Sequence, residues 1–157
     1  MIKKVLIIIA IIALLGTGYY FISPFFINIT ANEATPVSST IGTVTDAPML
    51  KKTEIKSAQI VGTPGHKASG SIRIISNTID TYVRYEDFKT INGPDIYVYL
   101  AKDLDAKEYV SLGKVKATEG NINYKIPTEV NIKDYKYVLV WCKAFGVLFN
   151  YADISSL

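Results

Sequence analysis

The sequence predicts an all-β domain, an antiparallel β-sandwich or barrel, preceded by one N-terminal transmembrane helix. The first observation is a stretch from Val5 to Asn32 without a charged residue. The second is that, after Lys52, short segments rich in Ile, Val, Tyr and Phe are separated by Gly, Pro, Asn and Asp. The third is the length of 157 residues, which leaves room for one domain beside a helix. We expect an anchor over 1–30, a flexible linker over 31–52 and a β domain over 53–157.

The N-terminal apolar run has the length of a membrane span. A hydrocarbon core of about 30 Å needs about 20 helical residues, and Val5 to Phe26 meets that length. A cleavable signal peptide is the alternative, but its apolar region is shorter and ends in small residues. Tyr19 and Tyr20 stand where those small residues would be. The sequence therefore favours an uncleaved signal-anchor.

The charges beside this run predict its orientation. Lys3 and Lys4 precede it, and positively charged flanks stay in the cytoplasm. We expect a single-pass protein of the cell membrane, with a cytoplasmic N-terminus and an extracytoplasmic C-terminal domain.

The segment from Ala31 to Pro48 has the composition of a linker. Nine of its 18 residues are Ser, Thr, Gly or Pro, and none is aromatic. Such a segment buries too little apolar surface to offset the entropy of ordering it. The sequence predicts a flexible stalk here.

The β domain is expected to contain eight strands separated by turn residues. Alternation of side chains puts Ile96, Val98 and Leu100 on one face of a strand and Tyr97 and Tyr99 on the other. Because 137–149 is apolar almost throughout, we expect it to contain a central strand, covered on both faces, and the start of the strand that returns beside it. The predicted strands are 55–61, 70–76, 79–85, 95–101, 108–115, 121–126, 135–143 and 146–150.

Composition excludes several functions. Without Lys3 and Lys4, 15 basic residues face 14 acidic ones, so no electrostatic basis for nucleic-acid binding remains. One Cys and one His cannot form a structural zinc site or a blue-copper site within one chain. No hydrolase, P-loop or dinucleotide-binding motif occurs, so a stand-alone enzyme is not expected.

Cys142 is the main candidate for chemistry. It shares a strand face with Val140, while Trp141 and Lys143 point the other way. Cys142 is then either a small buried hydrophobe or a redox thiol or soft ligand of a prosthetic group such as haem. A disulfide between two chains is a third option, and it needs an exposed thiol.

His66 is the second candidate. It lies in a Gly/Pro turn between the first two predicted strands, where an exposed loop histidine is the ordinary interpretation. The alternative is a second ligand or proton partner opposite Cys142. Trp141, Phe88, Tyr97 and Tyr99 are interpreted as core or sheet-face aromatics and not as a ligand cage.

Four segments in order resemble a known family: "GHKASGSIRI", "VRYEDFKTINGPDIYVYLAKD", "VSLGKVKATEGNINYKIP" and "YVLVWCKAFGVLFNYADI". They are similar to the DM-thirteen domain, an electron-transfer module found beside DOMON domains in Skeletor-type surface proteins. The most specific blocks are Gly93-Pro94-Asp95 with the strand that follows, Ser111 to Gly113, and Trp141 to Phe145.

The resemblance implies a β-rich extracytoplasmic domain in which Cys142 is a redox-active thiol or a ligand for a group such as haem. His66 matches a histidine of the first block. In this interpretation Trp141, Gly93, Pro94, Asp95 and Phe88 are supporting residues. The chain shows no companion DOMON or cytochrome-like domain, so electron transfer would need a separate redox partner at the membrane. The alternative function is a non-catalytic extracellular binding module with a buried Cys142.

Overall fold

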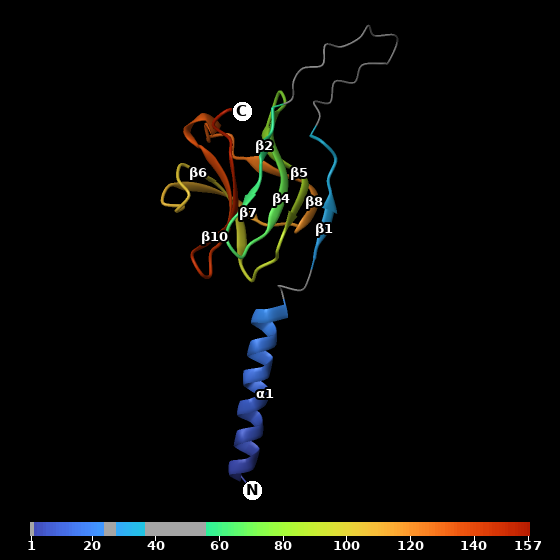
Figure 1. The fold of residues 1–157 in the computed structure, drawn as a ribbon, viewed down its shortest axis with the longest axis vertical. Coiled ribbons are helices and arrows are strands. Elements are labelled where there is room, and N and C mark those ends of the chain that lie inside the picture. Colours follow the sequence, from blue (N-terminus) through green and yellow to red (C-terminus); the bar gives the residue numbers. More distant parts are fainter. Residues whose placement is uncertain (1, 24–27, 37–55) are drawn as a thin grey trace.

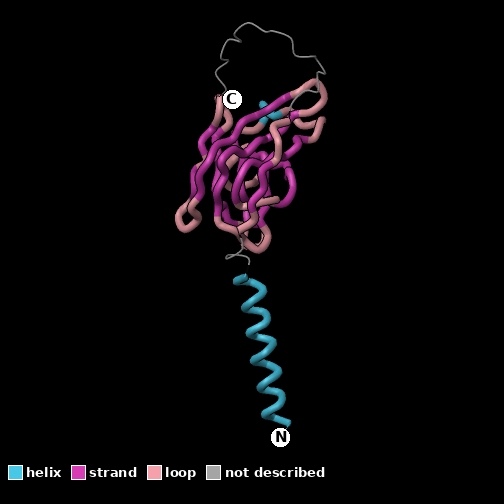
Figure 2. Tube along the Cα trace, turned by 90° about the vertical axis from the view of Figure 1, so that its right-hand side faces the viewer, coloured by secondary structure: helices cyan, strands magenta, loops and turns pink. Residues whose placement is uncertain are grey.

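The computed structural model describes residues 2–23, 28–36 and 56–157. One long helix, α1 (Ile2–Ile22), stands apart from a domain built of two packed sheets (Figure 1). A view from the side shows the helix leaving one end of that domain (Figure 2). The predicted all-β class is therefore confirmed, and the domain is a sandwich.

Helix α1 is long and apolar enough to cross a membrane, and it buries none of its spanning window in the rest of the molecule. A helix of this length rises about 32 Å at 1.5 Å per residue, which matches a hydrocarbon core. A signal sequence near the N-terminus satisfies the same criteria.

The first sheet, sheet A, has the strand order β1-β8-β5-β4-β2. All its neighbours are antiparallel except β1 and β8, which are parallel. Its strands are β1 (Thr30–Asn32), β2 (Ala58–Gln59), β4 (Ala68–Ser76), β5 (Thr81–Thr90) and β8 (Glu119–Ile126).

The second sheet, sheet B, is antiparallel and has the order β3-β10-β9-β6-β7. Its strands are β3 (Val61–Gly62), β6 (Ile96–Ala101), β7 (Tyr109–Lys114), β9 (Tyr137–Cys142) and β10 (Val147–Asp153). Strand β9 is the middle strand, as its continuous apolar pattern predicts.

The predicted strand over 55–61 differs from the structure. The described part of this segment is divided, because β2 pairs with β4 in sheet A while β3 pairs with β10 in sheet B. The chain therefore crosses from one sheet to the other at Ile60, whose N–H donates to the Gly70 carbonyl over 3.0 Å.

Strand β5 continues to Thr90, five residues beyond the predicted end at 85. A bulge accounts for the difference, because the register against β8 shifts between Tyr85 and Phe88. Asp87, inside the bulge, has a φ of 49°, and such an irregularity breaks the alternation on which the sequence prediction depends.

The predicted linker is wrong at its start, because β1 pairs with β8 from Thr30 to Asn32. The carboxylate of the next residue, Glu33, accepts a hydrogen bond from the Asn123 N–H at 2.8 Å. It also forms an ion pair with Lys116 at 3.1 Å. Gly120 permits the pairing, since a Cβ at that position would collide with the Ala31 carbonyl. The rest of the predicted linker, 37–52, lies outside the described residues.

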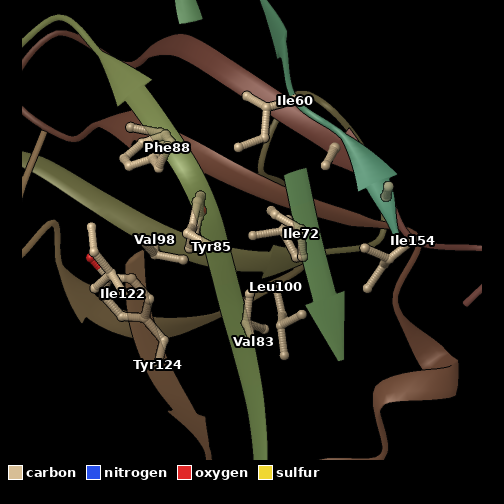
Figure 3. Packing of buried hydrophobic residues seen from close by; sticks show 14 of the residues in the cluster. Ile60, Ile72, Val83, Tyr85, Phe88, Val98, Leu100, Ile122, Tyr124 and Ile154 are labelled. Atoms are coloured by element: carbon tan, nitrogen blue, oxygen red, sulfur yellow. The ribbon is translucent and has the colours of Figure 1, made fainter. Parts of the chain in front are cut away.

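The core lies between the two sheets. Ile72, Val83 and Tyr85 from sheet A meet Val98 and Leu100 from sheet B (Figure 3). All five side chains are at most 1% exposed. No helix of the α type occurs among the described residues after α1, and a 3-10 turn spans Ile132–Asp134.

Candidate functional site

Cys142 ends the middle strand of sheet B. Its backbone pairs with Ile96 of β6 on one side and with Val147 of β10 on the other. The side chain is 0% exposed and belongs to the inter-sheet core with Val140. Alternation along β9 explains this placement, and it puts Trp141 on the outer face, as predicted. Cys142 is a free thiol with no exposed surface, so a disulfide to a second chain does not fit this geometry.

The loop 91–95 closes the core beside Cys142. The Gly93 N–H donates to the Asn92 side-chain oxygen over 2.8 Å. A Cβ at Gly93 would lie 2.9 Å from the ring of Phe149, so only glycine lets the loop pass this close. The Asp95 carbonyl accepts a hydrogen bond from the Lys143 N–H at 2.9 Å. Gly93 and Asp95 therefore support the strand end at Cys142 through backbone packing and a backbone hydrogen bond.

Phe88 and Pro94, the other predicted supporting residues, lie in packed positions of the core and of the loop before β6. Phe88 is 3% exposed in the inter-sheet core, with its ring 4.6 Å from that of Tyr85. Pro94 is half-buried in the loop before β6. Neither is joined to Cys142 by a recorded hydrogen bond or ring contact within the described residues.

His66 is held by a hydroxyl and a ring. Its imidazole stacks on Phe149, with centroids 4.1 Å apart and planes inclined by 23°. Its Nδ1 lies 3.1 Å from the Thr63 Oγ1. That hydroxyl also reaches the carbonyl oxygens of Leu148 at 2.8 Å and Phe149 at 3.0 Å. Thr63 therefore connects the turn to β10 by hydrogen bonds.

The hydrogen bonds of Thr63 decide the tautomer of His66. A hydroxyl has one hydrogen, and carbonyl oxygens can only accept. The Thr63 hydrogen therefore points to β10, and the His66 Nδ1–H donates to the hydroxyl oxygen. When His66 is neutral, its Nε2 keeps a lone pair for a proton or an external ligand.

His66 and Cys142 lie at the same end of the sandwich but are not paired. Phe149 belongs to the same core cluster as Cys142, and its other contact is the His66 ring. Among the described residues, no hydrogen bond or ring contact joins His66 to Cys142, and no group of three His, Cys, Asp or Glu side chains could hold a metal ion.

The surroundings of Cys142 do not fit a haem ligand. An axial thiolate needs room for iron and a porphyrin beside the sulfur, whereas this side chain has no exposed surface. A pocket of about 530 Å³ opens at the same end of sheet A, between Lys67, Ser69, Lys89 and Glu119. Neither Cys142 nor His66 lines that pocket.

The outer face of sheet B carries a second cluster that the sequence analysis recognised only in part. We define the outer aromatic face as Tyr97, Tyr99, Tyr109, Tyr137, Trp141 and Tyr151. The Tyr99 and Tyr109 rings stack with centroids 4.1 Å apart. Burial and the neighbouring Tyr109 raise the pKa of Tyr99 to about 12. Tyr97 and Tyr99 lie on one sheet face, as expected, and alternation in 137–141 was the signal for Tyr137 and Trp141. The register shift between Leu148 and Asn150 hides Tyr151 from such a pattern.

Lysines flank this face. The Nζ atoms of Lys114 and Lys143 each lie 5.7 Å from the centroid of Tyr97, within the range of cation–π attraction. Lys143 therefore stands on the face opposite to Cys142, where it cannot stabilise a thiolate, as alternation predicts.

Fold and site together define a class: a two-sheet β-sandwich that follows an apolar helix and encloses one free thiol. The family model described as electron transfer DM13 matches residues 61–154. The chain belongs to this electron-transfer family, and the match includes Cys142 and His66. No curated protein and no solved structure matches the chain.

Proposed function

We propose that this protein is a membrane-anchored, extracytoplasmic electron-transfer accessory domain in which Cys142 is the redox centre. The observation that carries the proposal is the family match over 61–154, which takes in most of both sheets. Membership in an electron-transfer family supports a redox-related role.

Helix α1 supplies the anchor in this proposal. Its residues after Lys4 carry no charge, and the large apolar side chains described along it are exposed in the folded chain. An exposed apolar helix is unstable in water and stable in hydrocarbon. Lys3 and Lys4 keep the N-terminus in the cytoplasm, so the sandwich lies on the opposite side of the membrane.

Cys142 has the redox role because sulfur is the one oxidisable soft donor in the described core. Its burial limits the chemistry: a thiol reacts through its thiolate, which needs access and a polar environment. Cys142 therefore reacts only when the 143–146 hairpin that follows it opens, or when a partner displaces that hairpin. Donor and acceptor are separate redox partners at the membrane.

A second function, a non-catalytic binding module, is favoured by one specific observation. Cys142 is fully buried in apolar surroundings, as a structural cysteine would be. In that case the outer aromatic face, with its half-buried rings and flanking lysines, is the surface available for a ligand.

One experiment separates the two functions. The full chain is prepared in detergent micelles, and its thiol is titrated in the native state before and after exposure to oxidised glutathione and then to a reductant. A redox thiol attacks the added disulfide, forming a mixed disulfide and releasing one glutathione thiol, and the reductant restores it; Cys142→Ala shows neither step. A featureless response, with a thiol that reacts only after denaturation, rejects the redox role and leaves the binding module.

The matched control is Cys142→Ala compared with Trp141→Phe. Both positions are adjacent on β9, but they face opposite sides of sheet B. A redox signal that depends on Cys142 persists in Trp141→Phe. A signal lost equally in both variants indicates general damage to the sheet and contradicts a role for the thiol.

A further inference from the structure

The register of sheet A identifies which of its strand ends lie beside the anchor. Thr30, at the start of β1, pairs with Glu119 at the start of β8. Glu119 also pairs with Lys89, near the end of β5. These three positions therefore share the end of the sandwich at which the chain enters from α1 (Figure 1).

The register of sheet B places the 143–146 hairpin at that same end. The loop 91–95 leads from β5 directly to Ile96, which pairs with Cys142. Cys142 pairs with Val147 across the hairpin. We call this side of the sandwich, with residues 28–29, 91–95 and 143–146, the anchor end; the sequence colours of Figure 1 place it on the side that faces α1.

The connection between helix and sandwich is short. Ser23 follows α1, and Asn28 is five peptide units further on. Five residues span at most about 18 Å when fully extended. The next residue, Ile29, is fixed to the sandwich, because its N–H donates to the Thr118 hydroxyl at 2.9 Å and its carbonyl accepts from the Thr118 N–H at 2.7 Å. The anchor end therefore cannot move far from the point where α1 ends.

Apolar side chains are exposed at this end. Phe145 is 63% exposed in the hairpin, and Ile29 is 46% exposed. Gly146 has a φ of 63°, which suits the tight hairpin that presents Phe145 to solvent. An aromatic side chain exposed beside a membrane anchor is well suited to the bilayer interface.

The charge at the anchor end complements an anionic surface. Lys67 and Lys143 are exposed and make no ion pair within the described residues. Asp95, in the loop 91–95, and Glu119, at the start of β8, each bind a lysine. Within 28–29, 91–95 and 143–146, together with Lys67 beside them, the uncompensated charges are thus positive, and lysines close to a membrane are attracted to anionic headgroups.

We propose that the anchor end docks on the bilayer that holds α1, with Phe145 inserted among the lipid headgroups and Lys67 and Lys143 against anionic lipid. The inference rests on the proposed function in taking α1 as a membrane anchor. The sequence predicted a domain that a stalk holds away from the membrane. In this proposal the domain lies on the lipid surface instead, with Cys142 at the base of the docked hairpin.

Quenching by brominated lipid tests this docking in the full chain. The protein is reconstituted into vesicles of phosphatidylcholine and phosphatidylglycerol with a dibrominated phosphatidylcholine. Phe145→Trp and Ile79→Trp are each placed in a Trp141→Phe background, so that one indole reports. Ile79 is the matched control, because it is 79% exposed in the β4–β5 turn at the opposite end of the sandwich.

Docking predicts that brominated lipid reduces the Phe145→Trp emission about twofold or more and leaves Ile79→Trp unchanged, as expected for an interfacial indole. Equal quenching at both positions overturns the proposal. So does a concentration-dependent blue shift of Phe145→Trp without quenching, which indicates a second copy of the chain as the occupant.

Flotation of the same vesicles separates this proposal from the function on which it rests. If the chain floats and Phe145→Trp is unquenched, docking is rejected and the anchor stands. If the chain does not float, both are rejected. Should Trp141→Phe lower the melting temperature, the same variants are measured in the native background by difference.

Discussion

The imidazole of His66 stacks on the ring of Phe149, with centroids 4.1 Å apart, and so covers the anchor end of the core. Phe149 in turn packs against the loop at Gly93. His66 therefore stabilises this end of the core, independently of any role as a ligand.

His66→Ala is expected to destabilise the sandwich by about 1 kcal/mol, because a stacked ring pair contributes about 0.5–1.5 kcal/mol beyond its buried area. Urea unfolding of the full chain in micelles measures the change. His66→Phe keeps the stacking and removes the hydrogen bond to Thr63, so it should recover most of the loss. If both variants are equally unstable, the ring contact is not what stabilises this end.

The second prediction concerns the stability of Cys142 variants, because apolar side chains surround the Cys142 sulfur. Cys142→Ser puts a hydroxyl into that environment and should cost about 1–3 kcal/mol. Cys142→Ala removes one atom and should cost about 1 kcal/mol, an ordinary value for a mild core change. Chemical denaturation of the two variants gives both values.

Cys142→Ser is expected to lose more stability than Cys142→Ala, and this difference decides which variant suits a redox test. Alanine is the cleaner substitution for any redox test, since serine combines loss of the thiol with loss of stability. A Cys142→Ser protein as stable as the parent would mean that the site is open to water, contrary to its 0% exposure.

The sequence predicted that Cys142 and Trp141 lie on opposite faces of a central strand, because alternation depends only on the backbone; whether Cys142 is buried stayed open until both sheets were placed. The sequence failed where the backbone is irregular. The bulge at Asp87 concealed the end of β5. Strand β1 is three residues long in a polar segment and is stabilised by partners about 90 positions away, a relationship that no local pattern contains.

Functional geometry was harder to predict for the same reason. The fixing of His66 by Thr63 and β10 joins residues more than 80 positions apart. The anchor end becomes visible only when the register of both sheets is known, because its segments come from three separate parts of the chain.

The hydroxyl of Tyr85 is buried and has no hydrogen-bond partner among the residues that the structure describes. Burial raises its pKa well above 10, with a smaller effect of Tyr124. Tyr85→Phe removes a polar group that lost its water on folding. Thermal unfolding should show a stability that is unchanged or higher by about 1 kcal/mol.

The matched control for Tyr85 is Tyr124→Phe. The Tyr124 hydroxyl accepts a hydrogen bond from the Lys116 N–H at 2.9 Å, so its removal leaves a donor unsatisfied and should cost about 1–2 kcal/mol. A loss of stability in Tyr85→Phe as large as in Tyr124→Phe would show that a buried water or another group binds the Tyr85 hydroxyl.

Glu33 should make the attachment of β1 depend on pH. Burial alone raises its pKa, but the Asn123 N–H and Lys116 outweigh that effect and hold the pKa below its usual 4.5. Because the folded-state pKa is the lower one, the carboxylate stabilises the fold above about pH 4.5 and loses this effect as the pH falls through the folded value.

The difference in unfolding free energy between the parent and Glu33→Gln should therefore be largest near neutral pH and shrink below pH 4.5. Since β1 connects the sandwich to its short tether, the protection factors for amide exchange at Thr30–Asn32, which are corrected for the slower intrinsic exchange in acid, should fall over the same pH range. A difference that stays constant from pH 7 to pH 3 would show that the Glu33 charge does not hold β1 in the sheet.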